Sequence, residues 1–252
     1  DQDDPKLIEF IARHTLPRRG IIAQPDEILV TMGAQNALWL TAQVLLTQRR
    51  TAAIENPCYH ALRDILMQSR CHLMPVDVDR DGLPPENLPD EADVIFTTPS
   101  HQAPTNATMP LARRKALLAR AAEMEALIVE DDYEFEVSFL RAPLPALKSL
   151  DTEGRVIYVG SFSKSIFPGL RRGVFGGSSI WMQAPDHIDM GLIDGPLRQA
   201  GVLIEPGHPF FHGADRPRNF YRLAYSSIPS DRIPQGIAHI ARELALISGQ
   251  AS

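Results

Sequence analysis

The chain has 252 residues, of which 44% are hydrophobic, and its 25 basic and 31 acidic residues give a formal net charge of −6. This length suits one large core, or a large lobe with a smaller one. The negative charge argues against a protein that wraps nucleic acid unaided, so any action on DNA would require a separate basic module.

Short apolar runs rich in β-formers alternate with helical patterns through the first part of the chain. The expected strands are residues 28–32, 52–55, 72–76, 94–97, 127–130, 156–160 and 173–175. Helices are expected between them, including residues 35–46 and residues 111–125, the latter just after Pro110. This alternation predicts an α/β domain with a mainly parallel, seven-stranded sheet over residues 1–176.

The order of elements changes after Gly177. Strands are expected at residues 179–183, 202–205 and 220–225, around a helix near residues 190–200. A last helix, residues 233–246, carries apolar side chains at helical spacing. We expect these elements to form a smaller C-terminal α+β lobe over residues 177–252.

The sharpest chemical signal is the string G-S-F-S-K at residues 160–164, followed by P-G-L-R at residues 168–171. Lys164 follows an apolar strand, where partial desolvation lowers the pKa of an amine and lets it attack an aldehyde. Small hydroxyl residues before it can bind a phosphate, and Arg171 supplies a fixed positive charge for the same group. For a lone lysine, the ordinary alternative is a solvated side chain after a strand.

The string E-D-D-Y at residues 130–133 also stands at a strand end. A buried carboxylate beside a pyridine nitrogen keeps that nitrogen protonated, and a nearby tyrosine can bond a phenolic oxygen. A solvated turn and an acidic site for a divalent metal explain the string equally well.

Two further strings precede helices. T-M-G-A-Q at residues 31–35 places a glycine where the backbone can approach an anion, although a helix start alone would explain it. E-N-P-C-Y-H at residues 55–60 contains Tyr59, which could stack on a flat ring or pack as an ordinary tyrosine.

The last two strings are a loop and a strand. T-P-S-H-Q-A-P-T-N at residues 98–106 is a proline-rich polar loop of a kind that is often only a turn. Y-R-L-A-Y-S-S at residues 221–227 places Arg222 on a strand, where it could clamp a carboxylate or remain exposed.

Together these six strings resemble the aminotransferase-like domain of MocR/GabR-type transcription regulators, in order and spacing along nearly the whole chain. The resemblance implies a pyridoxal-phosphate (PLP) dependent transferase fold of type I. It also implies that a complete regulator carries a winged helix-turn-helix DNA-binding domain ahead of this one.

The resemblance assigns roles by matching strings. Lys164 would be the catalytic residue that forms the internal aldimine, Asp131 would pair with the pyridine nitrogen, Tyr133 with the ring hydroxyl, and Tyr59 would stack on the ring. His101 would line the cofactor pocket. The residues implied to surround the phosphate are Ala34, Gln35, Ser161, Ser163 and Arg171. Arg222 matches the arginine that takes the α-carboxylate of an amino-acid ligand, and no metal is expected.

The chain departs from the family pattern at three places. Asp1 begins within the aminotransferase part, so we expect a fragment. The loop has P-T-N at residues 104–106 where the family usually has glycine third, but asparagine also adopts left-handed backbone. Residues 174–176 run almost directly into residues 177–181, where the family has several dozen more residues, so we expect a segment to be missing between Gly176 and Gly177.

The leading hypothesis is a sensor that binds an amino acid or amine as an external aldimine and shifts its own geometry to alter promoter binding. The alternative is a working aminotransferase in which Lys164 is also the general base. A metal-dependent protein that uses residues 130–132 would leave the other strings unexplained. The resemblance also implies a homodimer.

Two cysteines without a C-x-x-C pair, no apolar run of membrane-spanning length and no signal peptide suggest a cytoplasmic protein without membrane contact.

Overall fold

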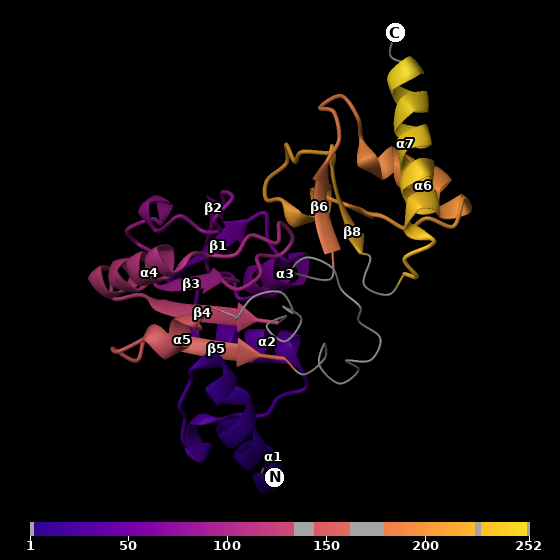
Figure 1. Cartoon of the computed structure of the whole chain (residues 1–252). Coiled ribbons are helices and arrows are strands. Elements are labelled where there is room, and N and C mark those ends of the chain that lie inside the picture. The colour runs from indigo at the N-terminus through magenta and orange to yellow at the C-terminus, as the bar shows by residue number, and fades with distance from the viewer. Residues whose placement is uncertain (1–2, 134–143, 162–178, 225–227, 251–252) are drawn as a thin grey trace.

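A computed structural model describes residues 3–133, 144–161, 179–224 and 228–250, which form two sheets with their helices (Figure 1). The larger sheet has five parallel strands in the order β2-β1-β3-β4-β5. Its strands are β1 (Thr51–Asn56), β2 (His72–Asp77), β3 (Val94–Thr97), β4 (Leu127–Asp132) and β5 (Val156–Gly160). The non-sequential order places β1 and β3 side by side at the centre, with β2 and β5 at the two edges.

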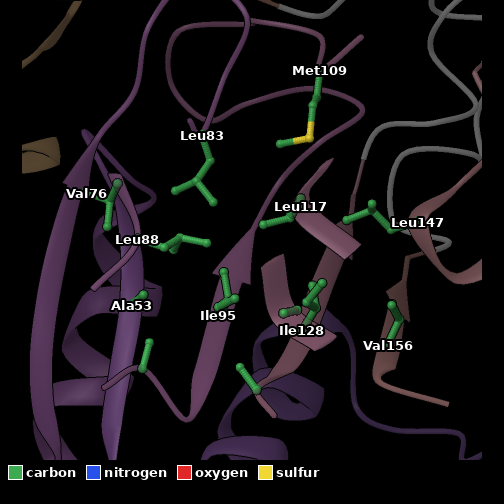
Figure 2. Packing of buried hydrophobic residues seen from close by; sticks show 13 residues of the cluster. Ala53, Val76, Leu83, Leu88, Ile95, Met109, Leu117, Ile128, Leu147 and Val156 are labelled. Atoms are coloured by element: carbon green, nitrogen blue, oxygen red, sulfur yellow. The ribbon is translucent and has the colours of Figure 1, made fainter. Parts of the chain in front are cut away.

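The central strands are buried on both faces, which is why they read as nearly continuous apolar runs. Alternate residues of each strand point to opposite faces. Ala53, Ile95 and Ile128 pack in a cluster with Leu117 of α4 (Leu111–Glu123), as Figure 2 shows. The residues between them join a second cluster on the opposite face, with α2 (Ala34–Leu45) and α3 (His60–Gln68).

The N-terminal segment is helical from Pro5 to Arg19. It begins with α1 (Pro5–Phe10), which Asp4 caps by accepting from the Lys6 N–H, and continues as a π-helical turn and a 3₁₀ turn. Gly20 ends it in the left-handed region, at φ +72°. A short helix, α5 (Leu147–Leu150), precedes β5.

The smaller sheet is antiparallel, in the order β6-β8-β7, with β6 (Ser179–Gln183), β7 (Glu205–Pro206) and β8 (Phe220–Ala224). Two helices complete this part, α6 (Met190–Gln199) and α7 (Ile233–Gln250), and Ile193, Leu197 and Ile240 contribute to its core.

The segment before β8 is tied to the end of β1. The Cys58 N–H donates to the Phe210 carbonyl at 2.9 Å, and the Arg63 guanidinium donates to the carbonyls of Pro209 and Phe211 at 2.7 and 3.1 Å. The smaller sheet is therefore anchored beside Tyr59, which stands between Cys58 and α3.

The α/β class with its parallel sheet is confirmed, and two expected strands need correction. Residues 28–32 do not form a strand, because side chains take their backbone donors: the Val30 N–H bonds to Asp3, and the Met32 N–H to Asn36. In the smaller sheet, the strand expected at residues 202–205 is reduced to Glu205–Pro206. The expected strand at residues 173–175 and the expected break after Gly176 lie outside the described residues.

No helix within the described ranges combines the length and the apolar character needed to cross a membrane.

Candidate functional site

The expected site residues gather where the parallel strands end. Tyr59 follows β1, His101 follows β3, Tyr133 follows β4 and Ser161 follows β5. Because parallel strands present their carboxyl ends at one edge, these side chains arise from the same edge of the sheet. That edge is where open α/β sheets bind their ligands.

Asp131 is the most informative of these residues. It is 6% exposed, and its atom Oδ1 has no hydrogen-bond partner among the residues that the structure describes. Burial raises the pKa of Asp131 to about 7, and the charge of Asp132 adds to the shift. A protonated ring nitrogen placed against Oδ1 would supply both the missing hydrogen bond and the missing positive charge. The side chain therefore fits the role expected of it beside a pyridine ring.

The neighbouring carboxylates point the other way, because successive strand residues alternate between faces. Glu130 accepts from the backbone N–H groups of Leu147 and Lys148 at 2.8 and 2.9 Å. Asp132 accepts from Arg19 Nε at 2.6 Å and from the Tyr158 hydroxyl at 2.8 Å. The three acids do not converge, and nowhere in the described ranges do three or more His, Cys, Asp or Glu side chains form a group that could hold a metal. Glu130 and Asp132 thus have separate partners on the face of β4 opposite Asp131.

Asp131 shares its face of the sheet with α2. Val129, two residues earlier on β4, packs in the cluster that includes Ala34, Leu38 and Tyr59. The start of α2 reaches the carboxyl edge, where the Gln35 amide donates a hydrogen bond to the Tyr59 hydroxyl. The structure therefore brings Ala34, Gln35 and Tyr59 together on the side of the sheet that Asp131 faces.

The start of α2 can accept an anion. Gly33 precedes the helix at φ +96°, and apart from its chain neighbours no atom of the described residues lies within 4 Å of the position that a Cβ would occupy there. The first N–H groups of a helix have no partner within the helix, so they attract negative groups. Gly33 and Ser161 line one groove of about 650 Å³ beside β5, which supports the expected pairing of this helix start with Ser161.

His101 and Tyr133 form a ring contact, with centroids 6.4 Å apart and planes at 79°. The contact joins the loop after β3 to the end of β4. Three other expected residues, Ser163, Lys164 and Arg171, lie outside the described residues.

A buried network around Glu55 escaped the sequence analysis. The Glu55 carboxylate accepts from Thr97 Oγ1 at 2.7 Å, from the N–H and Oγ1 of Thr98 at 3.0 and 2.6 Å, and from Gln102 Nε2 at 3.1 Å. Gln102 Nε2 also donates to the Pro57 carbonyl at 2.8 Å. These bonds fasten the loop that carries Tyr59 to the loop that carries His101. An acid directly after the apolar residues 52–54 was the available signal.

Asn106 completes that loop. Its φ is +64°, so it adopts the left-handed backbone expected at the position where the family has glycine. Its side-chain amide donates to the Ser179 carbonyl, which links the loop to β6.

Arg222 has a partner that sequence reasoning did not foresee. On β8 it donates from Nε to Glu205 Oε2 at 2.8 Å, and its guanidinium lies 5.3 Å above the centre of the Phe210 ring. Ring contacts then run from Phe210 to His60 at 5.6 Å and from His60 to Tyr59 at 5.2 Å. A series of ring contacts thus connects Arg222 to Tyr59 at the carboxyl edge. The charge of Arg222 is balanced by the Glu205 carboxylate.

Residues 1–193 match the family model described as aminotransferase class I and II. The HTH-type transcriptional regulator TauR of Rhodobacter capsulatus is 45% identical over 317 residues, which cover 97% of this chain and 66% of TauR. The probable rhizopine catabolism regulatory protein MocR of Rhizobium meliloti is 38% identical over 171 residues, 67% of this chain and 34% of that protein. The chain therefore spans between a third and two thirds of these curated relatives.

The TauR alignment is 317 residues long although the chain has 252. TauR thus has residues inside the aligned span that lack a counterpart here.

Solved structures agree on the fold. An archaeal alanine:glyoxylate aminotransferase superposes with a TM-score of 0.84 at 24% identity, over 98% of this chain and 80% of that one. Kynurenine aminotransferase of Pyrococcus horikoshii gives 0.81 at 24% identity, over 95% and 78%.

Proposed function

Because the chain belongs to the class I and II aminotransferase family, we propose that it is the PLP-binding effector domain of a MocR/GabR-type transcription regulator. The observation that carries the regulator assignment is the 45% identity to TauR over 97% of this chain. The effector would be an amino acid or another amine, captured at the cofactor aldehyde. PLP, when bound, supplies that aldehyde and a pyridine ring that withdraws electrons.

The described residues have distinct tasks around this cofactor. Asp131 would accept a hydrogen bond from the protonated ring nitrogen and balance its charge, and Tyr133 would donate to the phenolic oxygen. Tyr59 would stack on the ring. The start of α2, with Ala34 and Gln35, would bind the phosphate together with Ser161. His101, in edge contact with Tyr133, fixes the orientation of that tyrosine.

The remaining tasks fall to residues outside the described part. Lys164 would hold the cofactor covalently in the resting state, and Ser163 and Arg171 would complete the phosphate site. These roles rest on the string G-S-F-S-K and on P-G-L-R that follows it, matched to the family.

Arg222 would bind the carboxylate of an amino-acid effector. Its guanidinium is partly exposed, and Glu205 occupies the Nε–Nη2 edge. An incoming carboxylate must therefore use the other edge of the guanidinium or displace Glu205. The ion pair would thus affect how tightly effectors with a carboxylate bind.

The complete regulator would carry a winged-helix domain ahead of Asp1 and bind DNA through it, since an acidic domain repels the phosphate backbone. We also propose that it is a cytoplasmic homodimer with a large domain over residues 1–176 and a small lobe over residues 177–252. Regulation then requires that the effector bind one arrangement of the domains more tightly than another.

The second candidate is a working aminotransferase, which the family match and the fold of the solved aminotransferases favour. In that case Lys164 would also move a proton at the substrate carbon as general base. The residues around the cofactor are the same for both candidates, so turnover separates them.

The deciding experiment is an absorbance titration of the complete, PLP-loaded protein with a panel of amino acids and amines, followed by an assay for keto acid. A lasting spectral change without keto acid supports the sensor and identifies the effector class. Repeated release of keto acid with consumption of an acceptor would make the protein an aminotransferase.

A further inference from the structure

Arg19 is the last residue of the helical N-terminal segment, and its side chain is buried in the carboxyl edge of the large sheet. The residue is 2% exposed although its neighbour Arg18 is exposed. Gly20 makes this entry possible, because its φ of +72° turns the chain sharply, and an added Cβ would stand 3.2 Å from that of Ser149.

The guanidinium donates to three separate segments. Nε bonds to Asp132 Oδ2 at 2.6 Å, Nη1 to the Leu144 carbonyl at 2.9 Å, and Nη2 to Ser100 Oγ at 2.7 Å. A planar fork with fixed donor directions suits three acceptors at once, whereas an ammonium group would not set their geometry.

Two of these acceptors adjoin proposed site residues. Asp132 precedes Tyr133 and follows Asp131 on β4, and Ser100 precedes His101. Arg19 therefore braces β4 from the face opposite Asp131, and it braces the loop that presents His101 to Tyr133. A displacement of Arg19 moves the backbone on which these side chains stand.

The charge of Arg19 matters as much as its shape. Four acids, Glu55, Glu130, Asp131 and Asp132, are buried near this edge. Besides Arg19, Arg114 is buried there, with Nη1 at 3.9 Å from Glu130, and it donates to the carbonyls of Pro99 and Met109. Arg19 is the direct partner of Asp132, so its loss would leave that carboxylate without its counter-ion, a costly arrangement in the interior.

We propose that Arg19 is a positioning residue that couples the N-terminal segment to the cofactor site. Through Asp132 and Ser100 it holds Asp131, Tyr133 and His101 in the arrangement that binds PLP. By reciprocity, PLP binding stabilises the segment from Pro5 to Arg19, which leads toward the proposed DNA-binding domain. The inference rests on the proposed contact of Asp131 with the cofactor ring.

The test compares Arg19→Met and Arg19→Lys with the control Arg13→Gln, in the complete protein. Arg13 lies on the same segment, but its side chain is 72% exposed and pairs only with an exposed carboxylate, that of Glu9, among the described contacts. Three quantities are measured: the PLP dissociation constant, the pH midpoint of the absorbance of bound PLP, and amide hydrogen exchange over residues 5–20 with and without PLP.

For Arg19→Met we expect PLP affinity to fall by at least about tenfold, the lower end of what losing a supporting contact costs at metal sites. The pH midpoint rises, because one positive charge has left the neighbourhood of the protonated cofactor. PLP no longer slows exchange over residues 5–20. Arg19→Lys keeps the charge, so its pH midpoint should lie close to that of the parent. Its PLP affinity should stay below the parental value. The control matches the parent throughout.

A merely structural arginine would lower thermal stability without moving the pH midpoint. Arg19→Met could unfold the protein because it leaves the buried Asp132 carboxylate without a counter-ion. The double variant Arg19→Met, Asp132→Asn therefore removes both charges together. We expect it to fold and still to bind PLP weakly. Parental affinity and parental exchange protection in the double variant would overturn the proposal.

Asp131→Asn separates this proposal from the one it rests on. If Asp131→Asn leaves PLP affinity and the pH midpoint unchanged, the ring contact is wrong, and the role of Arg19 falls with it. If Asp131→Asn changes both while Arg19→Met changes neither, the ring contact stands and the coupling through Arg19 is overturned.

Discussion

Arg222 and Glu205 face each other across β8 and β7, with Nε and Nη2 of the arginine 2.8 and 2.7 Å from the same carboxylate oxygen. The arginine expected to receive an effector carboxylate thus already has one from its own chain. An acidic ligand that approaches the Nε–Nη2 edge must displace Glu205, and one at the other edge still meets its negative charge, whereas a plain amine meets neither obstacle.

Glu205→Gln is therefore expected to tighten binding of effectors that carry a carboxylate. The pair is partly exposed, so its rupture should gain at most about 1 kcal/mol, or roughly fivefold in affinity. Absorbance titrations of the PLP-loaded protein with an amino acid and with its decarboxylated amine measure the effect, and only the first should tighten. As a matched control, Asp189→Asn removes the charge from the partly exposed pair with Arg218, whose atoms lie 3.0 Å apart in the same part of the chain, and should change the affinity for neither ligand. Equal tightening for both ligands would show that Glu205 does not act through Arg222.

The raised pKa of Asp131 predicts a pH-dependent loss of stability in the PLP-free protein. Its folded pKa of about 7 exceeds the ordinary value of 3.8, chiefly through burial, so the folded state holds a proton that the unfolded state has released. The contribution of Asp131 to stability is therefore full below pH 3.8 and is lost as the pH rises toward 7. Asp131→Asn should remove this loss. Urea unfolding of both proteins at pH 5, 6 and 7 should show the variant gaining on the parent as the pH rises. A constant difference would contradict the assignment.

PLP should reverse the same trend. A protonated ring nitrogen beside Asp131 stabilises the carboxylate, which lowers its pKa and removes the cost of ionising it. In the parent, the gain in unfolding free energy on adding PLP should thus be larger at pH 7 than at pH 5. This difference between the two pH values should be smaller in Asp131→Asn.

The Thr98 hydroxyl should contribute measurably to stability through the Glu55 network. Thr98→Val keeps the shape but removes the hydroxyl that donates to Glu55 at 2.6 Å and accepts from the Ala103 N–H. A buried carboxylate that loses a donor costs about 1–3 kcal/mol, which urea unfolding can resolve. Thr108→Val, exposed in the same loop, should change the unfolding free energy by no more than about 0.5 kcal/mol.

Most strands and helices of the two sheets were predictable because their apolar periodicity is local. Residues 156–160 and 179–183 became β5 and β6 with the expected bounds. Residues 28–32 have the same β-rich composition, yet they do not pair, since Asp3 and Asn36 satisfy their donors. Composition cannot reveal which acceptor a backbone N–H will find.

The candidate site divides in the same way. Asp131, Tyr59 and Gln35 could be proposed from strings that stand at strand ends and helix starts. Arg19 and Glu205 could not, because their importance arises from partners 113 and 17 residues away in the chain. Arg18 is exposed and Arg19 is buried, but nothing in the sequence pattern distinguishes the two arginines.

Asn106 offers a direct test of the loop that replaces the family's glycine. Asn106→Gly keeps access to the left-handed backbone at φ +64° and loses only the side-chain bond to Ser179. Asn106→Ala loses that bond and also places alanine in the left-handed backbone conformation, which costs about 1–2 kcal/mol. Urea unfolding should therefore rank the alanine variant below the glycine variant by about 1 kcal/mol, since the greater flexibility of unfolded glycine offsets part of the strain. Equal stability of the two variants would mean that residue 106 is not left-handed, and the contact between this loop and β6 would have to be redrawn.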